Sequence, residues 1–335
     1  MNALDPSVEL MRLINAYQVS QALHVVAALG VADQLRDGPK SADTMARACG
    51  AHPRSLYRLL RALAALGVFH EGGDKEFSLT PLGVCLTSDA DGSSNYARWI
   101  GTQGQWRSWG NLLHCIKSGE SASQFTHGMD AWTYRKRHPE EQAVFNSAMT
   151  GTSRSHARAV LEAYDFSRFG CVVDVGGGQG LLLKEILLVC PTTRGILFDQ
   201  QQVVASADQV LASAGVAQRC QIVGGSFFES VPKDGDVYVM KAILHDWDDH
   251  ASIDILRACR RAMSPKAVLV IIERVIGPPN ENSEGKFSDL NMMVQYGALE
   301  RTRHEFQELL KNAGFAMTDV VPTRSPVSII IGQPM

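Results

Sequence analysis

A glycine-rich segment in the second half of this 335-residue chain has the composition of a ligand-binding loop. It reads Asp174-Val175-Gly176-Gly177-Gly178-Gln179-Gly180, directly after an apolar run and directly before a helical pattern. Glycines at such a turn let the backbone approach a ligand closely. The dinucleotide fingerprint also needs glycine five positions after its first one, but counting from Gly176 that position is Leu181. The spacing therefore argues against a nicotinamide cofactor.

Two acids narrow the choice of ligand. Asp174 lies in the mouth of the loop, where a carboxylate would repel a pyrophosphate and attract an ammonium group. Asp199 ends the next apolar run, about 20 residues further on, where a carboxylate accepts both ribose hydroxyls. A ligand with a ribose, a positive charge and no phosphate is S-adenosylmethionine. The alternative is a plain glycine-rich turn, with Asp199 at the end of its strand for an unrelated reason. It accounts for the loop but gives no reason for the position of Asp199.

S-adenosylmethionine is a methyl donor, and methylation of a hydroxyl would require a base, for which a histidine is the expected residue type. An unionised phenol, with a pKa of about 10, is a poor nucleophile at neutral pH, so the acceptor must lose its proton. Histidine suits this task because its ordinary pKa lies near the working pH. His245 follows the apolar run Asp236–Met240 and would lie at the same sheet edge as the glycine loop.

The elements that must position these residues alternate between strands and helices from Cys171 onward, which predicts a parallel sheet covered on both faces. Strands are predicted at Cys171–Val175, Gly195–Phe198, Gln221–Val223, Asp236–Met240 and Ala267–Glu273. Helices are predicted at Leu181–Val189, Val203–Ala214, Ser252–Met263 and His304–Asn312. Two closing runs, Ala316–Val321 and Val327–Ile331, are joined too tightly for a crossover helix and must pair antiparallel.

The first hundred residues predict a different fold. Helices are predicted at Ala22–Leu35, Ala42–Cys49 and Arg54–Leu66, followed by short strands at Val68–His70 and Phe77–Thr80. This order is typical of a winged helix, and an arginine-bearing face on the third helix raises DNA binding as one hypothesis. We divide the chain into a winged-helix-like domain at 1–95, a helical connecting region at 96–165 that contributes to the substrate pocket, and a cofactor-binding catalytic domain at 166–335.

Composition excludes several other classes. The formal net charge of −3 provides no global attraction to nucleic acid or anionic lipid. Every apolar run is shorter than a membrane span requires. The seven cysteines are scattered without a C-x-x-C pair, which indicates reduced thiols, and no residue cluster has metal-ligand spacing. We expect a cytoplasmic protein with no metal, no nucleic acid and no membrane partner.

The chain resembles the S-adenosylmethionine-dependent O-methyltransferases of the caffeic acid and hydroxyindole type along essentially its whole length. The matching strings, in order, are D-V-G-G-G-Q-G at 174–180, F-D at 198–199, H-D-W at 245–247, I-E-R at 272–274 and E-R-T at 300–302. The resemblance implies an α/β fold, with a Rossmann-like doubly wound methyltransferase sheet and an antiparallel last strand. It also implies that the mostly helical N-terminal domain forms a homodimer, with the apolar segment Ala22–Val31 packed across the two-fold axis.

The resemblance also implies roles for individual residues. His245 is the general base, and the acids Glu300, Glu273 and Asp246 respectively fix its tautomer, flank it and support it. Gly176 and Gly178 line the cofactor, Asp199 holds the ribose, and Lys241 lies near the adenosyl group. The acceptor pocket is lined by Trp247, Met292, Met149 and Phe145.

One position departs from the family pattern. Gly225-Ser226-Phe227-Phe228 stands where the family has an aspartate after the glycine, and that aspartate accepts a hydrogen bond from the adenine amine. The serine hydroxyl of Ser226 can also accept, but it is shorter and neutral. The exchange costs about 1 kcal/mol, a fewfold in cofactor affinity. Phe227 is implied to stack near the adenine.

The leading hypothesis is transfer of a methyl group from S-adenosylmethionine to a phenolic hydroxyl of a small aromatic compound of specialised metabolism, with S-adenosylhomocysteine as product. A second hypothesis is a repurposed enzyme of the same fold, acting as a hydroxylase, decarboxylase or pericyclase. Such relatives tend to lose the base and its acids, which this chain retains, whereas Ser226 keeps the alternative open. A third hypothesis is a cofactor-sensing regulator that binds DNA through the winged helix.

Overall fold

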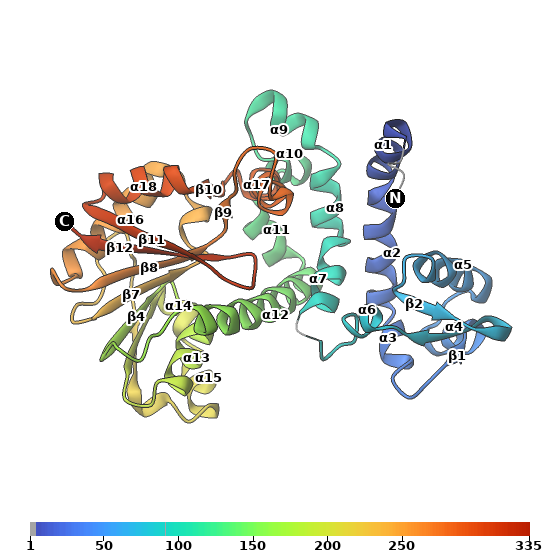
Figure 1. Cartoon of the computed structure of the whole chain (residues 1–335), viewed down its shortest axis with the longest axis horizontal. Helices are drawn as coiled ribbons and strands as arrows, with labels where there is room; N and C mark the ends of the chain where they lie inside the picture. Colours follow the sequence, from blue (N-terminus) through green and yellow to red (C-terminus); the bar gives the residue numbers. More distant parts are fainter. Residues whose placement is uncertain (1–4, 91) are drawn as a thin grey trace. The chain divides into compact units, whose positions relative to one another are not determined.

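The computed structural model describes residues 5–90 and 92–335 and separates into two compact units. The first unit comprises the residues up to Gly110 together with Thr126–Thr152, and the second comprises Asn111–Phe125 and Ser153–Met335. Helix α12 (Pro139–Ala163) runs from one unit into the other (Figure 1). The residues predicted as a connecting region are therefore helical, but they are shared between the two units.

The second unit is built on a seven-stranded sheet in the order β11-β12-β8-β7-β4-β5-β6. The strands are β4 (Cys171–Val175), β5 (Arg194–Asp199), β6 (Cys220–Gly224), β7 (Val237–Lys241), β8 (Val268–Glu273), β11 (Phe315–Pro322) and β12 (Ser328–Pro334). The first five of these run parallel, and β12 pairs antiparallel with both β8 and β11. The predicted doubly wound sheet with an antiparallel end is confirmed. Its topological switch point lies between β4 and β7, where ligands bind in such folds.

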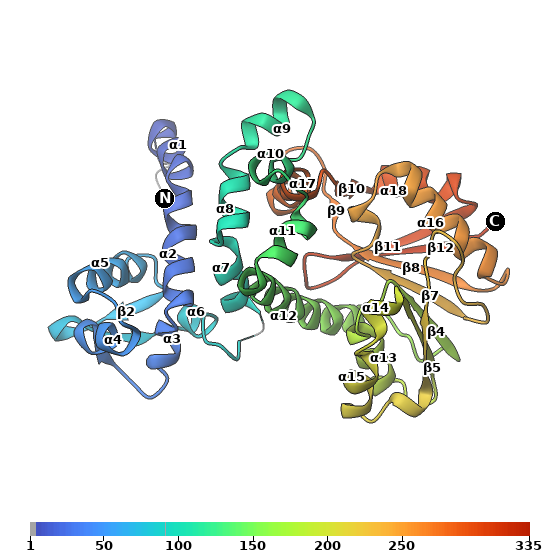
Figure 2. The same cartoon turned by 180° about the vertical axis from the view of Figure 1, so that it is seen from behind.

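Helices cover both faces of this sheet (Figures 1 and 2). On one face lie α13 (Leu181–Val189) and α15 (Ala207–Ser213), and on the other lie α16 (Asp249–Ala262) and α18 (Arg303–Asn312). Neighbouring strand residues point to opposite faces, so Val172 joins the core beneath α13 and Val173 joins the core beneath α16. The predicted helix Val203–Ala214 is in fact divided into α14 (Gln201–Val204) and α15 by a turn at Ala205–Ser206.

The first unit contains the predicted helix–helix–hairpin arrangement. Its N-terminal part consists of α2 (Ala16–Ala28), α3 (Val31–Gln34), α4 (Ala42–Cys49), α5 (Pro53–Ala64), and a sheet of β1 (Lys40–Ser41), β3 (Glu76–Leu79) and β2 (Phe69–Glu71). The expected helix Ala22–Leu35 is wrong in its bounds. It begins at Ala16 and ends at Ala28, because Gly30 takes a left-handed φ of +61° before the short α3.

Shorter helices make up most of the remaining chain of both units. They are α6 (Pro81–Val84), α7 (Ser93–Ile100), α8 (Gln103–Trp109), α9 (Leu112–Ser118), α10 (Ala122–His127) and α11 (Ala131–Arg137). In the second unit, α17 (Ser283–Tyr296) is followed by β10 (Arg301–Thr302), which pairs in parallel with β9 (Val275–Ile276).

Exposed apolar side chains gather on α1 (Pro6–Ile14) and the start of α2. Val8, Leu10, Met11, Leu13, Ile14 and Tyr17 are each more than 50% exposed. By contrast, Val26, Ala27 and Val31, within the segment predicted to cross the two-fold axis, are buried in their own unit. The apolar surface available to a second subunit therefore begins upstream of the predicted Ala22–Val31 segment.

The described residues contain no membrane-spanning helix, no metal cluster and no disulfide. No helix among these residues combines the length and the apolar character that crossing a membrane requires. No group of three or more histidine, cysteine, aspartate or glutamate side chains in this part of the chain could hold a metal ion. All seven cysteines are free.

Candidate active site

The glycine loop after β4 adopts a backbone that side chains disfavour. Gly176 and Gly178 have φ values of +71° and +61°. A Cβ at Gly176 would come within 2.4 Å of Ile243 Cδ1, whereas a Cβ at Gly178 would meet no atom within 4 Å. Gly176 is therefore required for packing, and Gly178 borders open space from which a ligand can approach the backbone.

Asp199 is held at the end of β5 by main-chain amides. Its Oδ2 accepts from the Gly178 N–H at 2.9 Å, and its Oδ1 accepts from the Gln200 N–H at 2.6 Å. Each carboxylate oxygen retains capacity for a further hydrogen bond. The arrangement ties the glycine loop to the predicted ribose-binding acid and fits a pair of vicinal hydroxyls.

Asp174 lies beneath the loop rather than openly in its mouth. The residue is 1% exposed, and a Cβ at Gly177 would come within 2.5 Å of its Oδ2. Among the described residues, Oδ2 has no hydrogen-bond partner. Burial raises the pKa of Asp174 to about 7, although the charge of Lys241 opposes the shift. A buried carboxyl with a free oxygen fits a cationic ligand above it, and its direct contact with that ligand stays a prediction.

Lys241, at the end of β7, joins the same environment. Its Nζ donates to Ser153 Oγ of α12 at 3.1 Å. Burial lowers the pKa of Lys241, against the attraction of Asp174 and Glu273. His156, one turn further along α12, has its pKa lowered to about 4 by burial and then by the charges of Lys241 and Arg274. The sequence interpretation identified neither Ser153 nor His156, because nothing in a helical pattern shows which side chains will face a distant strand end.

Three aromatic rings pack together, and one of them, Phe227, lies beside the loop. Phe228 and Trp247 pack edge to face at 4.9 Å between ring centroids, and Phe227 packs against Trp247 at 6.1 Å. Phe227 lies 3.7 Å from the Cβ position of Gly176, and its stacking near the adenine stays a prediction. Ser226 Oγ accepts from the Phe228 N–H at 3.3 Å. Trp247 therefore lies with the predicted cofactor residues, and its assignment to the acceptor pocket stays a prediction.

His245 lies in a short turn, Ile243–Trp247, that we call the base turn. Its Nδ1 lies 3.5 Å from Glu300 Oε1, and its Nε2 lies 3.7 Å from Asp246 Oδ1. Glu300 is 3% exposed, and Ser288 of α17 donates to the same Oε1 at 2.9 Å. Burial alone would lower the pKa of His245, but the hydrogen bond to Glu300 and the charges of the surrounding carboxylates raise it to about 9.

Glu273 hydrogen-bonds to the backbone of the base turn and acts on the imidazole only through its charge. Its Oε1 accepts from the N–H groups of Ile243, Leu244 and His245, at 3.0, 2.6 and 3.3 Å. Ala242, the residue just before the base turn, has a φ of +55°, a strained value for a residue with a side chain. Burial raises the pKa of Glu273, and the charge of His245 opposes this shift. Glu273 therefore shapes the turn that carries the base.

The remaining predicted acceptor residues lie in different units. Met292, on α17 of the second unit, is 6% exposed. Phe145 and Met149 belong to the part of α12 in the first unit, where Phe145 packs against Trp99 and carries the Arg135 guanidinium over its ring at 4.1 Å. Their place in one acceptor pocket stays a prediction.

Comparison with known proteins agrees with both units. A family model described as an O-methyltransferase domain matches residues 109–316, and one described as an O-methyltransferase dimerisation domain matches residues 11–89. A phenazine O-methyltransferase of Lysobacter antibioticus is 44% identical over 97% of this chain and 96% of its own. A mitomycin biosynthesis 6-O-methyltransferase of Streptomyces lavendulae is 37% identical over 93% of this chain and 90% of its own.

A solved structure extends the likeness to three dimensions. The S-adenosylhomocysteine-bound form of CalO1, a methyltransferase in calicheamicin biosynthesis, has a TM-score of 0.91 and 32% identity, and covers 99% of this chain and 100% of its own. The resemblance that the sequence motifs indicated is confirmed. The chain belongs to the S-adenosylmethionine-dependent O-methyltransferase family and carries that family's dimerisation domain.

Proposed function

We propose that this enzyme methylates a phenolic hydroxyl of a small aromatic acceptor, with His245 as the general base. The observation that carries the proposal is the setting of the imidazole. Its Nδ1 faces the buried Glu300 at 3.5 Å, and its Nε2, which has only the longer 3.7 Å approach to Asp246 Oδ1, is the nitrogen that we assign to the acceptor proton. Two relatives support an acceptor of this class: the Lysobacter one is named as a phenazine O-methyltransferase and the Streptomyces one as a mitomycin biosynthesis 6-O-methyltransferase.

The cofactor site fits S-adenosylmethionine. Asp199 would hold the ribose, the backbone of Gly176 and Gly178 would lie along the ligand, and the free Oδ2 of Asp174 suits positive charge. When bound, S-adenosylmethionine supplies a methyl group on a sulfonium, which leaves as a neutral thioether and needs no acid. The acceptor oxygen forms the new bond to carbon, and its proton passes to His245.

The raised pKa of His245 determines what fraction of the imidazole is neutral, and so able to accept a proton, at a given pH. With a pKa of about 9, roughly one imidazole in a hundred is neutral at pH 7 in the free enzyme. The reactive complex can be written with a neutral imidazole and a phenol or with an imidazolium and a phenolate. Both forms contain the same number of protons, so they belong to one ionisation state of the complex and depend on pH in the same way. The rate of methyl transfer therefore rises with pH until His245 of the free enzyme is neutral.

The first experiment titrates the purified protein with S-adenosylhomocysteine by calorimetry and then screens phenolic acceptors for a one-methyl mass gain. Binding of one ligand per chain followed by methylated product supports the proposal. Binding without methylation of any hydroxyl, but with conversion of an acceptor by another reaction, would instead support the repurposed enzyme. We also propose that the reaction needs no metal, because the histidine supplies the base, and we expect EDTA to leave turnover unchanged.

A further inference from the structure

Arg301 is the largest fully buried side chain among the described residues, and sequence interpretation gave it no role. It follows Glu300 directly and is 1% exposed. Its position is fixed by the short parallel ladder in which Arg301 pairs with Val275 of β9. A buried guanidinium is costly unless its donors are all used, so the partners of this one indicate what it does.

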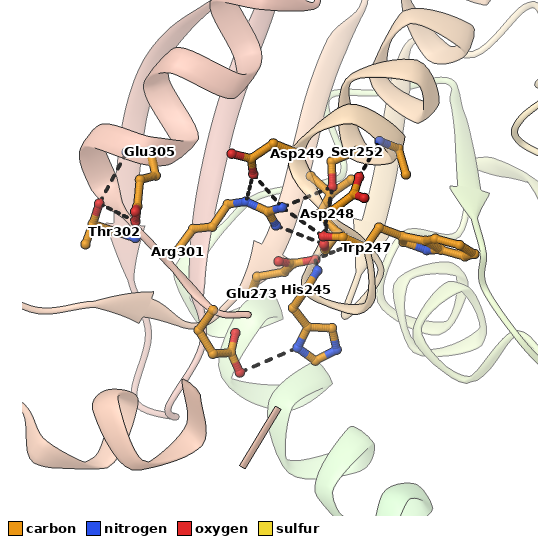
Figure 3. Close-up of polar contacts among 12 residues, drawn as sticks. His245, Trp247, Asp248, Asp249, Ser252, Glu273, Arg301, Thr302 and Glu305 are labelled. Carbon is orange, nitrogen blue, oxygen red and sulfur yellow. Dashed lines mark hydrogen bonds and ion pairs between the residues drawn. The ribbon is translucent and has the colours of Figure 1, made fainter. Parts of the chain in front are cut away.

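The guanidinium of Arg301 holds the base turn through main-chain carbonyls. Nη1 donates to Leu244 O at 2.9 Å and Nη2 donates to Trp247 O at 2.9 Å, on either side of His245 and Asp246 (Figure 3). Nε and Nη2 also donate to Asp249 Oδ1 at 3.0 and 2.8 Å. Because the Asp249 side chain is 67% exposed, this ion pair alone does not account for burying the arginine.

The two halves of the base turn are thus held by opposite charges. The Glu273 carboxylate accepts the amide protons of Ile243, Leu244 and His245, and the Arg301 guanidinium donates to carbonyls on both sides of His245. The Leu299 N–H donates to His245 O at 3.2 Å, from the residue just before Glu300. The segment that places the Glu300 carboxylate at the ring therefore also places the backbone beneath the ring.

We propose that Arg301 is a positioning residue for methyl transfer, which fixes the base turn so that the His245 imidazole keeps its alignment with Glu300. The inference rests on the proposed role of His245 as base. A lysine cannot replace this arginine, because one ammonium group cannot reach acceptors that the planar guanidinium fork spans. Gly178 and Asp199 bond to each other and not to the turn, so we expect most of the cofactor affinity to be kept when the turn loosens. The contacts of the turn with the cofactor residues are packing contacts, of Ile243 with Gly176 and of Trp247 with Phe227.

The chain contains a matched control. Arg219 also donates to three main-chain carbonyls, those of Leu187, Cys190 and Thr193, but it lies just before β6, at the sheet edge opposite the base turn. R301K and R219K therefore remove the same kind of contact near and far from the base. Both are expected to lower the melting temperature.

The test measures kcat, the KM for S-adenosylmethionine, the pH profile and S-adenosylhomocysteine affinity for both variants. For R301K we expect kcat to fall about 10- to 100-fold, the cofactor KM and affinity to stay within about twofold, and the rising limb of the pH profile to move to lower pH. For R219K we expect kcat and the pH profile to stay unchanged. Equal kcat losses in the two variants, or a kcat for R301K within about twofold of the parent, would overturn the inference.

A second variant keeps the inference testable if R301K does not fold. D249A leaves the buried arginine in place and removes the acceptor that orients its Nε and Nη2. We expect kcat to fall about two- to fivefold with an unchanged cofactor KM. An unchanged kcat in D249A contradicts the inference. H245A is measured in parallel, because turnover retained in H245A overturns the base assignment itself, whereas turnover lost in H245A and kept in R301K overturns only the role of Arg301.

Discussion

Two regions lie at the same end of the sheet but are held in different ways. One is the base turn, and the other is the cofactor edge, by which we mean the glycine loop and Asp199. The loop Asp174–Gly180 and Asp199 are joined mainly by main-chain amides, and the Oδ2 of Asp174 is left without a partner among the described residues. The base turn is fixed by side chains from β8, α17 and β10. Glu273 Oε2 and Glu300 Oε2 likewise lack partners among the described residues, so a carboxylate oxygen left for a ligand does not separate the two regions. What separates them is how the backbone is held: the base turn is bonded to two buried side chains, Glu273 and Arg301, whereas the glycine loop is tied to the side chain of Asp199.

The largest expected effect comes from removing the proposed base, which should change kcat and leave cofactor affinity unchanged. H245A is expected to lower kcat by about 10²- to 10⁴-fold, because the acceptor loses its proton acceptor. S-adenosylhomocysteine affinity should stay unchanged, because the side-chain partners of His245 are Glu300 and Asp246, which belong to neither the glycine loop nor the ribose-binding position. Steady-state kinetics and calorimetry on the same preparation test both statements.

The control for this variant is H250A. His250 is exposed on α16, five residues beyond His245, and is expected to leave kcat unaltered. If turnover persisted in H245A at the parental level, the base would have to be another group, and the base turn would need another purpose.

A substitution at the cofactor edge is expected to change cofactor affinity and to leave kcat almost unchanged. D199A removes a carboxylate predicted to accept two hydroxyl groups and also the acceptor of the Gly178 N–H. S-adenosylhomocysteine affinity should fall about 10- to 100-fold, while kcat at saturating cofactor changes little. Calorimetric titration measures the first quantity and saturation kinetics the second, with D208A on the exposed side of α15 as control. A large fall in kcat with unchanged affinity would remove the distinction between the two regions.

The sequence sufficed for features that depend on local pattern. The strand bounds near Cys171–Val175 and the helix Leu181–Val189 agree with the structure, because apolar periodicity and glycine punctuation act over a few residues. The glycine loop and Asp199 were recognisable for the same reason, since their spacing along the chain is itself the binding motif.

The base turn required the three-dimensional structure. Glu273 was predicted to flank the imidazole, yet its contacts are to backbone amides, which have no side-chain signature in the sequence. Arg301 was visible in a matched motif but its partners Leu244 O and Trp247 O are 57 and 54 residues away. Ser153 reaches Lys241 across 88 residues. Contacts set by tertiary packing cannot be assigned from spacing in one sequence.

The pH profile offers a finer comparison. With His245 as the proposed base, the neutral imidazole is the active form, so kcat/KM should rise with pH to a midpoint near 9, the pKa of His245. E300Q removes the hydrogen bond that most strongly raises this pKa, so the midpoint should move to lower pH, and the limiting kcat should fall about tenfold because the ring loses its orienting acceptor. A midpoint that did not move would exclude His245 as the group that titrates.

The raised pKa of His245 also makes the free energy of unfolding depend on pH. The folded-state pKa of His245 lies above its ordinary value of 6.5, so its contribution to the free energy of unfolding is fully present below pH 6.5 and is lost as the pH rises through about 9. Thermal melts from pH 6 to pH 10 should show a smaller decline for E300Q than for the parent. An equal decline would indicate that other groups control the alkaline limb.

The smallest expected effect concerns Ser226, where the cofactor edge departs from its family. The Ser226 hydroxyl already accepts from the Phe228 N–H, and the neighbouring Phe227 lies against the glycine loop. S226D restores a charged acceptor at the predicted adenine position and should raise S-adenosylhomocysteine affinity about threefold, with kcat unchanged. S226A serves as the reference for loss of the hydroxyl. Weaker binding by S226D would mean that this position does not contact the adenine amine, and that the cofactor edge is completed there by its aromatic rings.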